Sequence, residues 1–213
     1  MLDEKNDFIS VYQTIYIRTI IMKNIYVIAG CNGAGKTTAS YTILPEILDC
    51  KEFVNADEIA KGLSPFQAEK AAIEAGRIML SRIDELISQG VDFAFETTLA
   101  TKSHVTRLEK AQKKGYLVTL LFFWLKDVEL AKERVHIRIN EGGHSIPEAT
   151  IIRRYYAGIR NFFGIYLPVC DNVMLLDNSN NTPTFVMQQI KGEAPLILES
   201  DVYRQIKLSA NGY

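Results

Sequence analysis

One eight-residue stretch limits what this chain can fold into more than any other feature. It has the pattern G-x-x-x-x-G-K-[ST] and reads Gly30, Cys31, Asn32, Gly33, Ala34, Gly35, Lys36 and Thr37. An apolar run at 25–29 precedes it, and helix-compatible residues beginning with Thr38 follow it. A strand, a glycine-rich loop and a helix N-terminus in this order are typical of a phosphate-binding loop, because inward-turned backbone amides must face the phosphates. The stretch therefore predicts binding of a nucleoside triphosphate.

Two residues of this loop have predicted chemical roles. Lys36 is expected to neutralise the β- and γ-phosphates of ATP, and the Thr37 hydroxyl to be a ligand of Mg²⁺. The segment from Gly30 to Thr38 is the predicted ATP-binding segment. For Cys31 we prefer the interpretation of a spacer whose backbone binds phosphate; the alternative is a redox switch on ATP binding.

Short apolar runs alternate with longer helical patterns along the rest of the chain. This alternation predicts an α/β fold of the P-loop NTPase type, an open parallel five-stranded sheet with helices on both faces. A helical lid and a small C-terminal hairpin are expected to complete it. The expected strands are residues 25–29, 53–55, 91–95, 116–124 and 173–176, and the expected hairpin is 184–199.

Capping and breaking residues predict where the helices begin and end. The helix after the loop is expected to stop near Leu44, because Pro45 cannot continue it. Ser64 and Pro65 are expected to open a long helix that ends at Gly90. The remaining helices are expected at about 102–114, from Asp127 to about Asn140, after a capping box at Ser145 and Glu148, and as one or two turns in the tail.

Composition and charge restrict the class of protein. The chain has 213 residues, of which 47% are hydrophobic, and a net charge of −1, so we expect one well-buried core and neither nucleic acid nor a membrane as partner. Its three cysteines lack CxxC spacing, which indicates a reducing, cytoplasmic compartment. Residues 1–21 are expected to be an N-terminal extension, and residues 22–213 a single kinase domain.

Two acidic residues follow strands that end at the same edge of the sheet as the loop. Asp57 comes after the second strand, and Glu96 ends the third. Ligands bind at the carboxyl ends of parallel strands, and a kinase needs an acid there to accept the proton of the attacking hydroxyl. We therefore predict Asp57 as the catalytic base, with helix N-capping as the structural alternative. Asp177 is a weaker rival for Mg²⁺ after the last strand.

Arg134 and Arg138 lie four residues apart and share one face of their helix. A glycine pair at 142–143 follows, and then Arg153 and Arg154. In small phosphoryl-transfer enzymes such a segment is often a lid whose arginines close over the γ-phosphate. For Arg134 and Arg138 the lid role and an ordinary surface position are equally favoured. For Arg153 and Arg154 the surface position is slightly favoured.

Together these motifs resemble the zeta toxin family. The resemblance extends from about Ile25 to Ser179 and implies a P-loop kinase that uses ATP and Mg²⁺ to phosphorylate the 3′-hydroxyl of the amino sugar in UDP-N-acetylglucosamine. It also implies that Asp57 is the catalytic base, that Glu96 and Thr98 bind the substrate, and that the lid arginine is Arg134 or Arg138. It rests on residues 30–38, 55–60, 95–99, Arg134 and 142–147.

Two positions depart from the family pattern. Ala100 stands where family toxins have a substrate-holding arginine, and His144 lies near the position of their second lid arginine. Kinase chemistry therefore transfers better than the substrate, and the predicted acceptor is a small-molecule hydroxyl, for which a nucleotide sugar is one candidate. An epsilon-type antitoxin protein is a candidate partner.

A second class of function stays open. In this alternative, the chain is a P-loop ATPase or nucleotide switch that acts through protein partners. The sequence lacks the L-S-G-G-Q signature that an ABC-type subunit needs to reach its partner's nucleotide.

Overall fold

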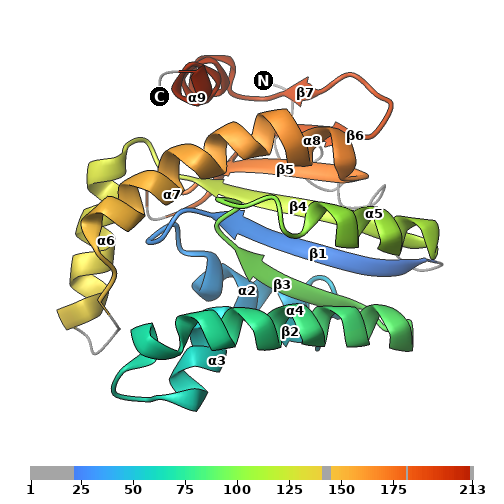
Figure 1. The fold of residues 1–213 in the computed structure, drawn as a ribbon. Helices are drawn as coiled ribbons and strands as arrows, with labels where there is room; N and C mark the ends of the chain where they lie inside the picture. The colour runs from blue at the N-terminus through green and yellow to red at the C-terminus, as the bar shows by residue number, and fades with distance from the viewer. Residues whose placement is uncertain (1–21, 141–144, 181, 212–213) are drawn as a thin grey trace.

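A computed structural model describes residues 22–140, 145–180 and 182–211 of the chain. Within these ranges seven strands form one sheet in the order β2-β3-β1-β4-β5-β6-β7 (Figure 1). The first five in this order are parallel to their neighbours, as the alternating sequence pattern predicts. The strands are β1 (Lys23–Gly30), β2 (Phe53–Val54), β3 (Phe93–Thr97), β4 (Tyr116–Trp124), β5 (Asn172–Asp177), β6 (Thr184–Ile190) and β7 (Leu196–Ile197).

Helices cover both faces of the sheet. In Figure 1, α4, α5 and α7 lie in front of the strands and α2 behind them, while α6 lies beyond the carboxyl ends of the strands. A sheet covered on both faces needs apolar side chains on both, which explains why every residue of β4 is buried. The helices are α2 (Lys36–Glu46), α3 (Ala56–Leu63), α4 (Ala72–Gln89), α5 (Val105–Lys113), α6 (Val128–Asn140), α7 (Glu148–Asn161), α8 (Leu167–Val169) and α9 (Ser200–Asn211).

The central position of β1 sets the geometry of the predicted site. β1 lies between β3 and β4, with Ile28 opposite Glu96 and Ala29 opposite Thr97. The loop that leaves β1 therefore emerges directly beside the end of β3. Parallel pairing thus brings Glu96 next to the phosphate-binding loop, although 59 residues separate Glu96 from Thr37.

The C-terminal hairpin is part of the main sheet, which corrects the expected five strands to seven. β6 pairs antiparallel with β5, and β7 pairs antiparallel with β6. Val186 and Met187 of β6 are fully buried. Burial of these side chains extends the core across the sheet and explains why the hairpin does not stand apart.

Three expected helix boundaries are wrong. Pro45 lies inside α2, in its last turn, where a proline removes one intrahelical hydrogen bond only. Ser64 ends α3, with its N–H donating to Ala60, and the long helix begins at Ala72 after one 3₁₀ turn. Small buried alanines of α3, the 3₁₀ turn and α4 pack together in a separate cluster. Their packing favours the interruption between α3 and α4 and so the later start of α4. At the start of α7, Pro147 replaces the expected Ser145 capping box, with no side-chain cap.

Other boundaries follow the sequence. The backbone N–H of Leu130 donates to Asp127 at 2.7 Å, as a helix cap requires, and Gly90 ends α4 with a φ of 74°. The tail helix α9 is longer than the expected one or two turns, since Ile206 is fully buried and Tyr203 packs edge-on against Phe163.

Some expectations fall on residues outside the described ranges. They are the extension at 1–21 and the break at 141–144, including the glycine pair and His144. In the part of the chain that the structure describes, none of the helices combines the length and the apolar character needed to cross a membrane.

Candidate active site

The phosphate-binding loop joins β1 to α2 and folds around the side chain of Lys36. The Lys36 ammonium donates to the carbonyl of Cys31 at 2.9 Å, and the residue is only 5% exposed. Gly35 has a φ of 77°, and a Cβ there would lie 2.6 Å from Nδ2 of Asn178. The same amide donates to the carbonyl of Ala34 at 2.8 Å. Lys36 and Asn178 therefore both hold the loop, in which Gly35 has the left-handed conformation that glycine allows.

Glu96 connects three neighbours at the mouth of the sheet. Its Oε1 lies 3.4 Å from the Lys36 ammonium. Its Oε2 accepts from the Thr37 hydroxyl at 2.7 Å and from the Asn55 amide at 3.0 Å. The Lys36 and Glu96 side chains are only 6% and 10% exposed. Each therefore offsets the charge of the other, which would be costly to bury without a partner. A hydroxyl and a carboxylate oxygen beside a phosphate-binding lysine are ligands that Mg²⁺ accepts, and the residues present therefore fit this ion.

Asp57 lies in the first turn of α3. The N-cap of this helix is Asn55, whose Oδ1 accepts from the backbone N–H of Asp57 at 2.8 Å and of Glu58 at 3.4 Å. The alternative that Asp57 caps this helix is therefore wrong. A carboxylate in the first turn of a helix is stabilised by the helix dipole.

One cavity of about 260 Å³ brings most of the predicted residues together. Segments far apart in sequence line it: the loop, the two acids that follow β2 and end β3, and α6. Its lining residues are Asn32, Gly33, Gly35, Lys36, Thr37, Thr38, Asp57, Glu96, Arg134, Ile137 and Arg138.

The two α6 arginines differ in their surroundings. The guanidinium of Arg134 donates to the carbonyls of Asn178 and Ser179, at 2.8 and 3.0 Å, and so ties α6 to the loop after β5. The Nε and Nη2 atoms of Arg138 are enclosed and have no hydrogen-bond partner among the described residues. Buried donors of this kind favour an anionic ligand in the cavity.

Several other expected residues lie outside the cavity lining, namely Gly30, Cys31, Ala34, Thr98, Arg153, Arg154 and Asp177. Thr98 is half-buried, and its carbonyl faces Gly158 of α7. Cys31 is buried, and this burial raises the pKa of its thiol to about 11, which supports the spacer interpretation over the redox switch. Asp177 accepts hydrogen bonds from the backbone N–H and the hydroxyl of Ser179, which occupies this carboxylate within its own turn.

Sequence reasoning missed three polar residues that shape the site. Asn55 links the α3 N-terminus to Glu96, and Asn178 holds the phosphate-binding loop. Arg154, for which we favoured a surface position, donates to Oδ1 of Asn32 at 3.2 Å. The N-cap position of Asn55 was a usable signal, whereas the other two contacts arise only from the packing of distant segments.

Comparison with known proteins agrees with this geometry. The family described as Zeta toxin matches residues 11–185, which is most of the chain. This chain belongs to the zeta toxin family. The expected P-loop NTPase fold of zeta toxin type is thereby confirmed, with two additional antiparallel strands at one edge of the sheet.

One bacterial protein is similar in sequence to this zeta toxin family protein, and several solved structures are similar to it in fold. An uncharacterized protein of Haemophilus influenzae (strain ATCC 51907 / DSM 11121 / KW20 / Rd) is 30% identical over 126 residues, which are 59% of this chain and 88% of the relative. The PezAT chromosomal toxin-antitoxin system of Streptococcus pneumoniae has a similar fold, with a TM-score of 0.59, 16% identity, and coverage of 98% of this chain and 97% of that one.

The AvrRxo1-ORF1:AvrRxo1-ORF2 complex solved with sulphate ions is also similar. Its TM-score is 0.71 at 17% identity, and the match covers 87% of this chain and 63% of that one, so this chain spans less than two thirds of that length. A structure of the same complex with ATP matches with a TM-score of 0.69, 17% identity and the same coverage. These likenesses concern the fold.

Proposed function

We propose that this zeta toxin family protein is an ATP-dependent kinase that transfers the γ-phosphoryl group to a hydroxyl of a small molecule. The observation that carries the proposal is the cavity that contains Lys36, Thr37, Asp57 and Arg138 together. Such a set combines a phosphate-binding cation, a metal-binding hydroxyl, a base and a charge-stabilising arginine. The ATP present in a structure of similar fold supports the choice of nucleotide.

Each of these residues has a defined task in the transfer. Lys36 binds the β- and γ-phosphate oxygens, and the Thr37 hydroxyl would hold a Mg²⁺ ion, which would supply positive charge to offset that of the phosphates. Asp57 accepts the proton of the acceptor hydroxyl as the new O–P bond forms and the bond to the β-phosphate oxygen breaks, which leaves ADP. Arg138 stabilises the charge on the transferred group, while Arg134, which lines the same cavity, is tied by its guanidinium to the loop after β5.

The acceptor and the partner are finer parts of the same proposal. A nucleotide sugar such as UDP-N-acetylglucosamine is the candidate acceptor, with Glu96 and Thr98 at the end of β3 as the residues that hold it. Ala100 argues for a different mode of acceptor binding from that of the toxins that carry an arginine there. An antitoxin protein is the candidate partner, since one of the similar structures is named AvrRxo1-ORF1:AvrRxo1-ORF2 and another comes from a toxin-antitoxin system. Residues 22–213 are proposed to form one kinase domain, with 1–21 as its extension.

The decisive experiment is a transfer assay with defined acceptors. The protein is incubated with ATP, Mg²⁺ and a panel of nucleotide sugars, and the products are examined by mass spectrometry for the gain of one phosphate. Asp57→Asn is expected to bind ATP normally and to transfer none, while Glu58→Gln, an exposed neighbour, keeps activity. Wild-type transfer by Asp57→Asn would remove Asp57 as the base. ATP hydrolysis stimulated by a protein, without a phosphorylated small product, would favour the nucleotide switch instead.

A further inference from the structure

One face of helix α7 contacts both the phosphate-binding loop and the turn after β3. Arg154, Gly158 and Asn161 are spaced at i, i+4 and i+7, so they follow one another along the same side of the helix. Arg154 meets the phosphate-binding loop, whereas Gly158 and Asn161 meet the turn after β3. Their order along α7 fixes how these two segments are placed relative to each other.

The contacts at the C-terminal end of this face are close and specific. A Cβ on Gly158 would lie 2.6 Å from the carbonyl oxygen of Thr98. The Asn161 amide donates to the carbonyl of Leu99 at 2.6 Å. Leu99 is fully buried and has a φ of 53°, a conformation that a leucine keeps only where its surroundings enforce it. These contacts hold α7 closely against the turn after β3.

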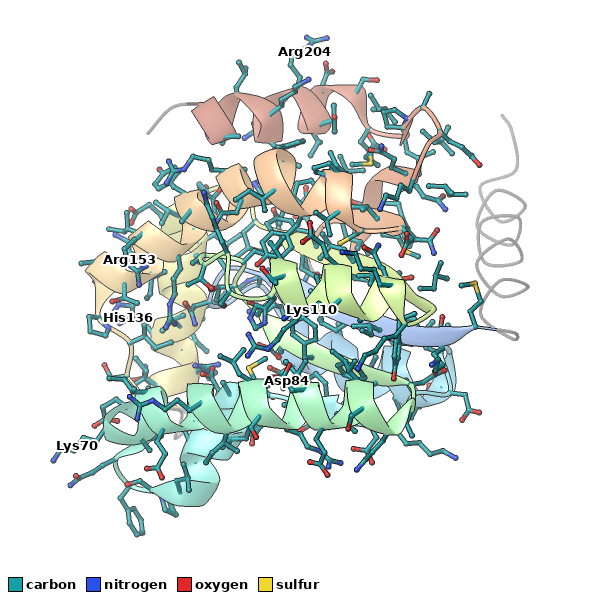
Figure 2. All side chains as sticks on the ribbon, turned by 45° about the vertical axis from the view of Figure 1, so that its right-hand side comes forward. Lys70, Asp84, Lys110, His136, Arg153 and Arg204 are labelled. Carbon is teal, nitrogen blue, oxygen red and sulfur yellow. The ribbon has the colours of Figure 1, made fainter. Side chains whose placement is uncertain are left out.

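Arg154 extends from this helix to the phosphate-binding loop. Its Nη1 donates to Oδ1 of Asn32, a residue that lines the cavity. Burial lowers the pKa of the guanidinium, and the carboxylate of Asp57 acts in the opposite direction. The guanidinium thus lies within the field of the proposed base as well as in contact with the loop. Its neighbour Arg153 is exposed, at the edge of the molecule in Figure 2.

The charges around the cavity leave a role for this arginine. Lys36 is partly neutralised by Glu96 at 3.4 Å, and the guanidinium of Arg134 is engaged by two backbone carbonyls. The Nη1 group of Arg154 donates to a neutral amide oxygen, and a guanidinium has five N–H donors in all. A phosphate oxygen carries negative charge and accepts two parallel hydrogen bonds from a guanidinium, so it is a stronger acceptor for Arg154 than a neutral amide oxygen.

We propose that Arg154 is a phosphoryl-binding residue of this site, which contacts the group in transfer from the side of Asn32 and Asp57. This inference rests on the proposed kinase function. The phosphoryl group in transfer is then held between arginines from two helices, Arg138 of α6 and Arg154 of α7. The Asn32 amide orients Arg154 before the nucleotide binds.

The test compares three variants without any acceptor. Binding of Mg²⁺–ADP alone, and of Mg²⁺–ADP with aluminium fluoride as a mimic of the group in transfer, is measured by calorimetry. Arg154→Ala is expected to weaken binding of the fluoride complex roughly 10- to 100-fold and of ADP alone less than about 3-fold. Arg153→Ala is the matched control and is expected to leave both unchanged. Arg154→Lys, which retains a charge on a flexible stem, is expected to lie between.

The outcomes separate this inference from the function on which it rests. If the wild-type protein binds the fluoride complex and Arg154→Ala binds it equally well, the role of Arg154 is wrong and the kinase proposal stands. If the wild-type protein binds neither ADP nor the fluoride complex, the kinase proposal fails and the role of Arg154 fails with it. Thermal melting of each variant checks that the fold is retained, and Arg154→Lys keeps the test valid if the alanine variant unfolds.

Discussion

The hydroxyl of Thr37 donates a 2.7 Å hydrogen bond to the same Glu96 carboxylate whose other oxygen faces Lys36 at 3.4 Å. The proposed metal ligand and the proposed phosphate-binding lysine therefore share one acid. Without a nucleotide this acid balances the buried ammonium. With a nucleotide bound it lies next to the triphosphate, where its charge is unfavourable unless Mg²⁺ offsets it.

Glu96→Gln is expected to separate these two effects. The amide retains the size of the side chain and removes its charge, so ATP without Mg²⁺ should bind roughly 3- to 10-fold more tightly, a change of about 1 kcal/mol. With saturating Mg²⁺ the gain should disappear, because the carboxylate also favours the metal. Calorimetry with EDTA and with Mg²⁺ measures both values. Glu85→Gln, an exposed acid on α4, is the control; weaker binding of Mg²⁺-free ATP by Glu96→Gln would contradict the argument.

Gly158→Ala is expected to destabilise the protein. The added methyl would lie 2.6 Å from the Thr98 carbonyl, a backbone atom that moves only with the turn after β3. Overpacking of this kind costs about 1–3 kcal/mol in the free energy of unfolding. Gly76→Ala on α4 is the matched control, since nothing lies within 4 Å of its added Cβ, and it should stabilise by about 0.5–1 kcal/mol. Urea unfolding compares the two, and equal stability changes would show that α7 is not pressed against this turn.

His104 makes stability depend on pH. It is 6% exposed and packs against Phe95 with ring centroids 4.8 Å apart. Burial, with a smaller effect of Arg107, lowers its pKa from 6.5 to about 4. Between these values the unfolded chain binds a proton that the folded protein does not, so stability falls as the pH falls from 6.5 toward 4, by up to about 3 kcal/mol.

The His104 effect is measured as the difference between variants across this pH range. His104→Leu should lose this part of the pH dependence, because no group at that position gains a proton on unfolding. Parallel profiles for wild type and His104→Leu would mean that His104 is protonated in the folded protein.

The three cysteines are expected to be unreactive in the folded state. They are Cys31, Cys50 and Cys170, all at most 5% exposed. Burial raises their pKa values to about 11, 12 and 12. At pH 8 the thiolate fraction of a group with a pKa near 11 is roughly 100-fold below that of an ordinary thiol. A thiol reagent should therefore label none quickly and all three after denaturation, and fast labelling of Cys31 would restore the redox-switch hypothesis.

Local patterns predicted the parts of the structure that local physics decides. The phosphate-binding loop, the five parallel strands, and the acids at their carboxyl ends follow from glycine positions and apolar runs alone. Since parallel strands end at one edge, Asp57 and Glu96 could be assigned to the same site as Lys36, and one cavity indeed contains them.

Contacts between distant segments could not be predicted in this way. Arg154 and Asn32 are 122 residues apart, and Asn178 and Ala34 are 144 apart. Both pairs depend on how α7 and the loop after β5 pack on the sheet. The predicted start of α4 was wrong for a similar reason. The packing of small alanines against α3 overrides the capping pattern at Ser64.

The two ends of the Asn55 side chain explain why an amide stands at this position. A helix cap alone would admit aspartate or serine about equally well, and threonine somewhat less well. Aspartate would place a second negative charge 3.0 Å from Glu96, where the amide now donates, and serine and threonine have no second polar end with which to reach it. Residue 55 must therefore both cap α3 and donate a hydrogen bond to Glu96. Which substitutions it tolerates should depend on Glu96 rather than on the helix that it begins.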